Sequence, residues 1–105
     1  MVVASSVAAL EKTNLKASDL DYIILATVTP DTHLNAAACE VQRKLGAYGS
    51  AALDIKAACA GFIYALDIAR SFVESGRNLN ALIIGSEKMS SIVNWEDRTT
   101  CVLFG

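Results

Sequence analysis

The chain has 105 residues, of which 53% are hydrophobic and 19% charged, and its formal net charge at pH 7 is -2. This length and composition suit one small globular unit and exclude a disordered, low-complexity or collagen-like segment. Nine Lys and Arg residues are scattered along the chain without a run, which argues against a nucleic-acid-binding surface.

No apolar run approaches the roughly 20 residues that a membrane-spanning helix needs. The opening residues also lack the basic and apolar regions of a signal peptide. We therefore expect a cytoplasmic protein with no membrane partner. Three cysteines without CxxC or His-rich spacing indicate neither a disulfide framework nor a metal site.

The first half of the chain is predicted to form a helix, a strand and a second helix. Apolar residues at helical spacing predict the first helix over Val3–Thr13. The run Tyr22–Thr27, which reads YIILAT, is typical of a strand buried on both faces of a parallel sheet. Helical spacing resumes over Leu34–Leu45, where Glu40 lies four residues before Lys44 and can pair with it.

The second half repeats this alternation. Ser50–Ile55 is a short predicted strand, and a helix follows that begins at Cys59 and is closed by Gly76. Ala81–Gly85 is another buried strand, and Thr99–Phe104 is predicted to be a last one. Strands that alternate with helices of these lengths predict an α/β fold, with a mostly parallel sheet layered with helices and right-handed crossovers.

Cys59 is the candidate nucleophile, because it directly follows a predicted strand at the first turn of a hydrophobic helix. Unpaired N–H groups and the helix dipole favour negative charge there, and the thiolate is the reactive form of cysteine. Its small neighbours Ala58, Ala60 and Gly61 leave room for a thioester substrate. The position also suits a small buried hydrophobic residue, which is the usual fate of a free cysteine, so both interpretations stay open.

The other two cysteines and the single histidine are predicted to lie away from the chemistry. Cys39 falls inside the second predicted helix and Cys101 inside the last predicted strand, so both are expected to pack in the core. His33 follows a turn at residues 29–31 and is expected to be a solvent-facing loop residue.

Four runs in the chain are more specific together than any one is alone: DLDYIILATVTPD, KAACAGFIYAL, ALIIGSEKMS and DRTTCVLFG. In their order and spacing the chain resembles the β-ketoacyl-acyl carrier protein synthase III family, the initiating condensing enzymes of type II fatty-acid synthesis. The resemblance covers nearly the whole chain and implies the thiolase-like fold. It implies that residues 1–105 are one partial domain, the N-terminal half of a synthase without its first strand and its C-terminal half.

The resemblance also implies a mechanism. In that family the cysteine of the ACAGF run accepts an acyl group, usually acetyl, from coenzyme A, which makes Cys59 the acyl carrier and its N–H part of an oxyanion hole. Malonyl-acyl carrier protein is then decarboxylated and attacks the thioester. The implied partners are acyl-CoA, malonyl-acyl carrier protein and a second copy of the full enzyme in a homodimer. Coenzyme A enters as a thioester substrate, and no resident cofactor is implied. The family's catalytic His and Asn belong to its second half.

Four further residues match substrate-binding positions of the family. Arg98 falls where an arginine contacts the adenine end of coenzyme A, although a surface ion pair with a neighbouring acidic residue is an alternative. Met89 and Phe104 match residues that line the acyl pocket, and each also suits an ordinary core. Leu34 replaces a common Phe that crosses the dimer interface into the partner's acyl pocket, so a longer acyl chain is expected to fit.

Two other interpretations stay open. Another thiolase-like enzyme, such as a polyketide starter synthase or a hydroxymethylglutaryl-CoA synthase, would use the same cysteine with different acid and base groups. A non-catalytic interaction module would instead pack its Ala-rich helix faces against a partner and bury Cys59. In either enzymatic case the 105 residues are expected to be inactive by themselves.

Overall fold

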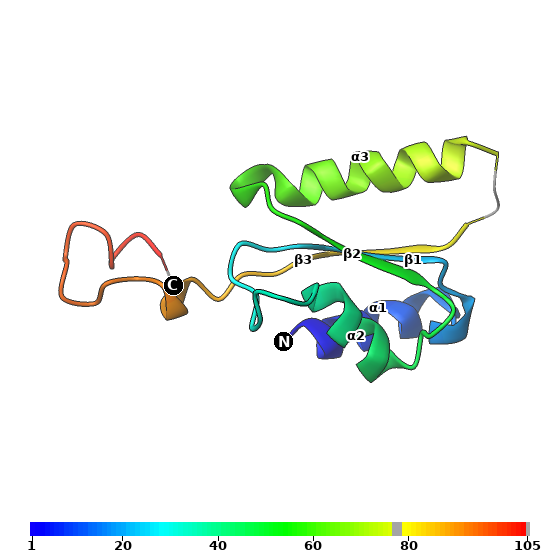
Figure 1. Cartoon of the computed structure of the whole chain (residues 1–105), viewed down its shortest axis with the longest axis horizontal. Helices are drawn as coiled ribbons and strands as arrows, with labels where there is room; N and C mark the ends of the chain where they lie inside the picture. The colour runs from blue at the N-terminus through cyan, green and yellow to red at the C-terminus, as the bar shows by residue number, and fades with distance from the viewer. Residues whose placement is uncertain (77–78, 105) are drawn as a thin grey trace.

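The computed structural model describes residues 1–76 and 79–104. Within these residues three parallel strands form one sheet, in the order β2-β1-β3, and helices cover both of its faces (Figure 1). The strands are β1 (Tyr22–Ala26), β2 (Ala51–Ile55) and β3 (Ala81–Gly85). The three predicted buried strands are therefore confirmed, and their ends differ from the prediction by at most one residue.

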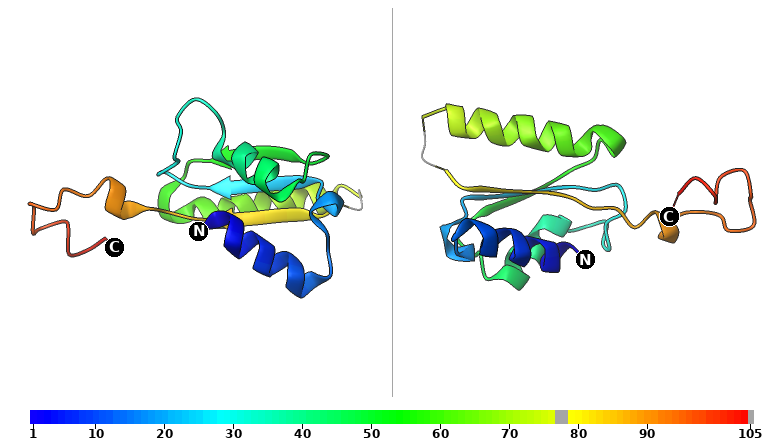
Figure 2. Two further views of the ribbon diagram at one scale, coloured as in Figure 1. Left: turned by 90° about the horizontal axis from the view of Figure 1, so that it is seen from below. Right: turned by 180° about the vertical axis from the view of Figure 1, so that it is seen from behind.

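The helices form two layers around this sheet. Helices α1 (Val2–Thr13) and α2 (Ala37–Leu45) cover one face, and α3 (Gly61–Glu74) covers the other. The two further views in Figure 2 show the same three layers from below and from behind. The predicted α/β architecture, a parallel sheet layered with helices, is confirmed. No helix among the described residues is long and apolar enough to cross a membrane.

Strand β1 lies at the centre of the sheet and supplies both halves of the core. Its side chains alternate, as they must in a strand: Ile23 and Leu25 pack on the side of α1 and α2, and Ile24 and Ala26 pack on the side of α3. Ile23 and Ile24 are both 0% exposed. Burying each such side chain stabilises the fold by about 1.5–3 kcal/mol, so β1 holds the two helical layers together.

Helix α2 begins at Ala37, three residues after the predicted start at Leu34. The carboxylate of Asp54, on β2, accepts hydrogen bonds from the backbone N–H groups of Ala37 (2.7 Å) and Ala38 (2.8 Å). It thereby satisfies two of the N–H groups that every helix start leaves without a partner. A cap supplied from another element fixes where the helix begins, and local sequence cannot reveal it. On the same helix Glu40 pairs with Arg43 rather than with the expected Lys44.

The predicted last strand, Thr99–Phe104, is wrong, because this segment forms a series of turns. Asp97 directs the local chain: its carboxylate accepts hydrogen bonds from the N–H and the hydroxyl of Thr99 and from the hydroxyl of Thr100. Such side-chain bonds favour a turn over an extended strand. The same bonds hold the pKa of Asp97 below its usual value.

The residues after β3 leave the sheet and form an arm over 86–104, which extends beyond the layered body in Figures 1 and 2. The arm contains one short 3₁₀ helix, η3 (Met89–Ser91). The arm accounts for the elongated shape of the molecule, with extents of 49 × 29 × 25 Å.

The two cysteines that were expected in the core lie elsewhere. Cys39 is exposed, because it follows Ala38, which faces the sheet, and the next residue of a helix points about 100° away. Cys101 is partly exposed in the turns of the arm. Both core predictions are therefore wrong. His33 is exposed in the loop before α2, as expected.

Candidate active site

Cys59 lies on the connection between β2 and α3. A short 3₁₀ helix, η2 (Ala58–Ala60), separates the two elements, and Cys59 is its middle residue. The predicted start of the helix at Cys59 is thus corrected: the α-helix begins two residues later, at Gly61. The preceding residue, Ala58, has φ of 45°, in the left-handed region that residues other than glycine rarely adopt. This conformation costs on the order of 1–3 kcal/mol and turns the chain sharply from strand to helix.

The side chain of Cys59 is exposed among the described residues, so the alternative in which it is buried in this core is wrong. The backbone hydrogen bonds of this turn leave one N–H without an acceptor. The N–H of Ala60 donates to the carbonyl oxygen of Ala57 (3.1 Å), and that of Gly61 donates to Ala58. The N–H of Cys59 donates to no acceptor within residues 1–76 and 79–104. Both the thiol and the adjacent N–H are therefore available to a ligand.

Gly61 sets the position of this turn against the sheet. A Cβ at Gly61 would lie 3.0 Å from the Cβ of Ala26, the last residue of β1. Only glycine therefore lets the start of α3 approach the central strand this closely. The parallel register aligns Ala26 with Ile55 of β2 and Gly85 of β3. Cys59 is thereby held at the edge where the carboxyl ends of all three strands meet, the usual position of ligand sites in parallel α/β sheets.

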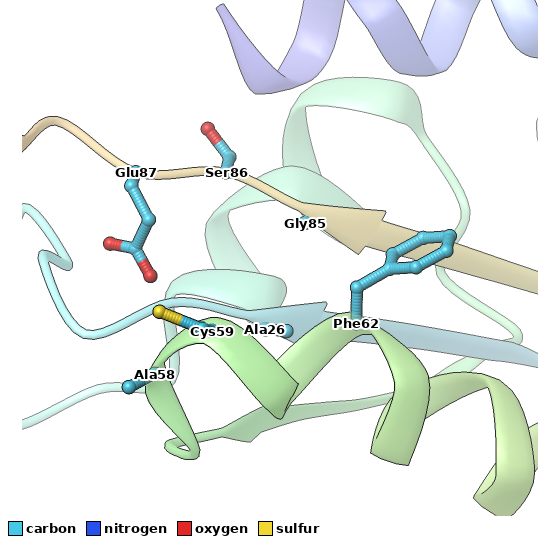
Figure 3. A pocket seen from close by; sticks show the side chains of 7 residues that line it. All are labelled: Ala26, Ala58, Cys59, Phe62, Gly85, Ser86 and Glu87. Atoms are coloured by element: carbon cyan, nitrogen blue, oxygen red, sulfur yellow. The ribbon is translucent and has the colours of Figure 1, made fainter. Parts of the chain in front are cut away.

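A pocket of about 230 Å³ opens beside Cys59 at this edge (Figure 3). It brings together residues from β1, η2, α3, the end of β3 and the segment after it, which lie far apart in the sequence. The lining residues are Ala26, Ala58, Cys59, Phe62, Gly85, Ser86 and Glu87. In Figure 3 the thiol of Cys59 and the carboxylate of Glu87 point toward each other across the mouth of the pocket. The pocket therefore combines largely apolar walls with one thiol and one carboxylate.

Glu87 is the centre of the hydrogen-bond network at this site. One carboxylate oxygen accepts a bond from the N–H of Val28 (2.9 Å). The other accepts bonds from the hydroxyls of Thr29 (2.6 Å) and Thr27 (3.3 Å). The hydroxyl of Thr29 in turn accepts a bond from the N–H of Lys88 (2.8 Å). The ends of β1 and β3 are thus tied together beside the pocket.

The network also determines the charge of Glu87. Partial burial alone would raise the pKa of its carboxyl group, but the hydrogen bonds from Thr29, Val28 and Thr27 together outweigh burial. The pKa of Glu87 is therefore lowered, because each of these bonds favours the ionised form. The group is a carboxylate at neutral pH.

The four expected substrate-binding residues do not line this pocket. Leu34 lies in the loop before α2 and is 94% exposed. Met89 is partly exposed in η3, and Arg98 and Phe104 are exposed further along the arm. The ion pairs found among the described residues do not include Arg98. The structure thus places Cys59 in the pocket and the other four on the loop and the arm, so their assignment stays a prediction.

Sequence reasoning did not identify Glu87, Thr27 or Thr29 as parts of the site. A usable signal was present, because polar residues follow directly after two predicted buried strands, β1 and β3. The carboxyl ends of adjacent parallel strands meet at one edge of a sheet. No group of three or more His, Cys, Asp or Glu residues in the described part of the chain is placed to hold a metal ion.

Comparison with known proteins identifies the family. The profile of 3-Oxoacyl-[acyl-carrier-protein (ACP)] synthase III matches residues 53–105. Beta-ketoacyl-[acyl-carrier-protein] synthase III of Caldanaerobacter subterraneus subsp. tengcongensis is 55% identical over 105 residues, which are 100% of this chain and 32% of that protein. The chain spans about a third of the length of the curated relatives it matches.

Solved structures agree with this assignment. The crystal structure of 3-oxoacyl-[acyl-carrier-protein] synthase III from Aquifex aeolicus is 55% identical, with a TM-score of 0.96, over 100% of this chain and 34% of that one. The priming beta-ketosynthase of a polyketide biosynthetic pathway is 34% identical, with a TM-score of 0.92, over 100% of this chain and 31% of that one. The chain therefore belongs to the 3-oxoacyl-[acyl-carrier-protein] synthase III family, and its layered parallel sheet is part of that family's thiolase-like fold.

Proposed function

We propose that the full protein containing this chain is a condensing acyltransferase that joins an acyl-CoA primer to malonyl-acyl carrier protein at the start of fatty-acid synthesis. The observation that carries the proposal is the exposed Cys59, held at the mouth of a pocket at the carboxyl edge of the sheet. Membership of the family supports the same chemistry. We further propose that the protein works as a homodimer in the cytoplasm, with coenzyme A as part of the substrate and no resident cofactor.

In the first proposed step, the thiolate of Cys59 attacks the thioester carbonyl of acyl-CoA. The bond to the coenzyme A sulfur breaks, coenzyme A leaves as a thiol after taking up a proton, and the acyl group stays on Cys59. The carbonyl oxygen carries negative charge while the tetrahedral intermediate exists. The backbone N–H of Cys59, which has no acceptor within the described residues, is suited to stabilise that charge as one donor of an oxyanion hole.

In the second proposed step, malonyl-acyl carrier protein loses CO₂, and the resulting carbanion attacks the acyl group on Cys59. A carbon–carbon bond forms, the thioester to Cys59 breaks, and β-ketoacyl-acyl carrier protein is released. The acid and base groups for this step are expected in the part of the protein outside this chain. His33, the chain's only histidine, lies in an exposed loop and is not proposed for it.

The proposed contacts to the substrate lie on the loop and the arm. We assign Arg98 to the adenine end of coenzyme A, and Met89 and Phe104 to the wall of the acyl pocket. Leu34 is assigned to the partner subunit's acyl pocket, which it would reach across the homodimer interface. Its 94% exposure is compatible with such a contact.

A second candidate function is priming of a polyketide rather than of a fatty acid. It is favoured by the likeness to the priming beta-ketosynthase, at 34% identity and a TM-score of 0.92. The acylation of Cys59 would be the same in both. The two functions differ in the carrier protein that receives the primer, so assays with malonyl-acyl carrier proteins from fatty-acid and polyketide synthesis separate them.

The proposal is tested by incubating the full-length protein with acetyl-CoA and locating the acetyl group by mass spectrometry of its peptides. Acetylation of Cys59 is expected, with none at that position in Cys59→Ala. Cys39→Ala and Cys101→Ala serve as matched controls and are expected to acetylate normally. If Cys59 is acetylated no faster than Cys39 and Cys101, the assignment of the nucleophile is wrong.

A further inference from the structure

Glu87 has no part in the acyl transfer described above, although it lines the same pocket as Cys59. Figure 3 shows its carboxylate extending from the segment after β3 toward η2, where it faces the thiol. A partly buried carboxylate placed beside a nucleophile requires a reason, since burial disfavours its charge. Its hydrogen bonds supply one.

The groups around the Glu87 carboxylate are hydrogen-bond donors, which suits a group that only accepts. Its two oxygens receive three donors, the N–H of Val28 and the hydroxyls of Thr27 and Thr29. Thr27 is only 7% exposed, so its hydroxyl depends on protein partners. An ionised carboxylate accepts through both oxygens and donates nothing, and bonds to a charged acceptor are stronger than neutral ones. Glu87 therefore holds the three residues after β1 in one conformation.

Two functional segments begin at this network. The loop that leads to Leu34 starts after Thr29, and the arm that carries Met89 and Arg98 passes through Lys88, whose N–H donates to the hydroxyl of Thr29 (2.8 Å). The direction in which each segment leaves the sheet is set at these bonds. Both segments carry the residues proposed to contact the acyl group and coenzyme A.

We propose that Glu87 is a positioning residue of the acyl site, which holds the exits of β1 and β3 in register with Cys59 through Thr27, Val28 and Thr29. The inference rests on the proposed function, because the site it shapes is the acyl site of Cys59. Glu87 acts through hydrogen-bond geometry, so an uncharged group of the same length preserves most of its effect.

The test compares Glu87→Ala, Glu87→Gln and Glu87→Asp in the full-length protein. The readout is the single-turnover rate of acetyl transfer from acetyl-CoA to Cys59. A displacement of about 1 Å at a reacting centre can cost on the order of a hundredfold in rate, so Glu87→Ala is expected to lose at least about tenfold. Glu87→Gln keeps the length, an oxygen that can accept from the N–H of Val28 and an NH₂ group that can donate to the threonine hydroxyls, so it is expected to stay within about threefold of the wild type. Glu87→Asp is one methylene too short and is expected to resemble the Ala variant.

The rate at which iodoacetamide alkylates Cys59 is a second readout. It would change if the substitution damaged the structure around Cys59 in general. This small reagent does not use the walls of the acyl site, so its rate in Glu87→Ala is expected to stay within about threefold of its rate in Glu87→Gln, which lacks the same charge beside the thiol. A parallel loss of alkylation and acetyl transfer in Glu87→Ala would overturn the inference, because it would indicate collapse of the turn at Cys59. Equally slow acetyl transfer by Glu87→Gln and Glu87→Ala would overturn it too, since charge would then be the operative property.

Thr29→Val keeps the inference testable if Glu87→Ala does not fold. It removes the hydroxyl that joins Glu87 to Lys88 while preserving side-chain volume, and it is expected to slow acetyl transfer without changing alkylation. Thr13→Val is the matched control, because the Thr13 hydroxyl only donates to the carbonyl oxygen of Leu10 within α1 (3.0 Å). If acetyl transfer is normal in all three variants, Thr29→Val, Glu87→Gln and Glu87→Asp, the inference is contradicted. Absence of acetylation in the wild type would instead refute the proposed function.

Discussion

A substitution at Leu34 tests the specificity for the acyl chain most directly. Its side chain is 94% exposed, and the family that the chain resembles commonly has Phe at this position. A smaller side chain would leave more room in the acyl pocket that Leu34 is proposed to enter. Acyl chain length is therefore expected to depend on this residue.

Leu34→Phe in the full-length protein is expected to reduce activity with longer acyl-CoA primers more than with acetyl-CoA. A few methylene groups in an apolar pocket are worth about 1–3 kcal/mol, or roughly 10–200-fold in kcat/KM. The measurement is kcat/KM for acetyl-CoA and for a series of longer primers in both proteins. If the ratio of kcat/KM for longer primers to kcat/KM for acetyl-CoA is the same in the wild type and in Leu34→Phe, this role of Leu34 loses its support.

Glu87 makes the stability of the folded protein depend on pH in the acidic range. Its pKa is lowered in the folded state from the usual value of 4.5, so the unfolded chain binds a proton more readily than the folded chain does. The stability that Glu87 contributes is therefore fully present above about pH 4.5 and is lost as the pH falls through the lower folded pKa. A neutral side chain at this position cannot show that loss.

The expected result is a difference in thermal midpoint between wild type and Glu87→Gln that is largest near neutral pH. It should shrink as the pH is lowered from neutral to below about 4.5. Thermal unfolding of both full-length proteins across this range provides the measurement. A difference that stays constant with pH would show that Glu87 does not titrate in this way.

At the level of elements, the contact between the start of α3 and the end of β1 decides where Cys59 lies. Gly61→Ala would place a Cβ at 3.0 Å from the Cβ of Ala26, so helix and strand must move apart. Overpacking of this kind costs about 1–3 kcal/mol. Since Cys59 lies two residues before Gly61, acetyl transfer is expected to fall together with stability.

A second substitution makes this prediction specific. Ala26→Gly removes the opposing Cβ, so the double variant Gly61→Ala with Ala26→Gly is expected to recover part of the lost acetyl transfer. Gly49→Ala is the matched control, because a Cβ there meets no atom within 4 Å and should have little effect. Thermal midpoints and acetyl-transfer rates of the wild type, the two single variants, the double variant and the Gly49→Ala control check the prediction. If the effects of Gly61→Ala and Ala26→Gly simply add in the double variant, the prediction is contradicted.

At the level of the whole molecule, α3 carries several large apolar side chains that are exposed. Phe62, Ile63, Tyr64, Leu66 and Val73 on this helix are 45%, 61%, 54%, 47% and 47% exposed, respectively. In the described sheet β2 and β3 are also edge strands, and open edges and apolar patches promote association. The chain is therefore expected to self-associate when it is produced as the 105 residues alone.

Size-exclusion chromatography with light scattering at several concentrations tests this expectation. Species larger than a monomer should appear, whereas a well-behaved monomer throughout would count against it. The isolated 105 residues are also expected to form no β-ketoacyl product, because the acid and base groups proposed for decarboxylation lie outside them. Any measurable condensation by this piece would refute that expectation.

Much of the fold was predictable because its signals are local. The strand YIILAT is apolar on both faces, and its alternate residues supply the core on both sides of the sheet, as a central parallel strand requires. Helical spacing likewise predicted α1 and α3 to within two residues of their starts. The prediction failed at Thr99–Phe104, where β-branched composition suited a strand but the side chain of Asp97 bonds the chain into turns.

The alternation of strands and helices, the family resemblance and the candidacy of Cys59 could be predicted without coordinates, because periodicity and motifs depend on neighbouring residues. The three-dimensional fold was needed to show that Cys59 lies on a 3₁₀ turn, that Asp54 caps α2 and that Glu87 joins the ends of β1 and β3 beside the thiol. Each of these depends on groups that the parallel register brings together from distant parts of the chain. Glu87 and Val28 are 59 residues apart in sequence, yet they are 2.9 Å apart between carboxylate oxygen and backbone nitrogen.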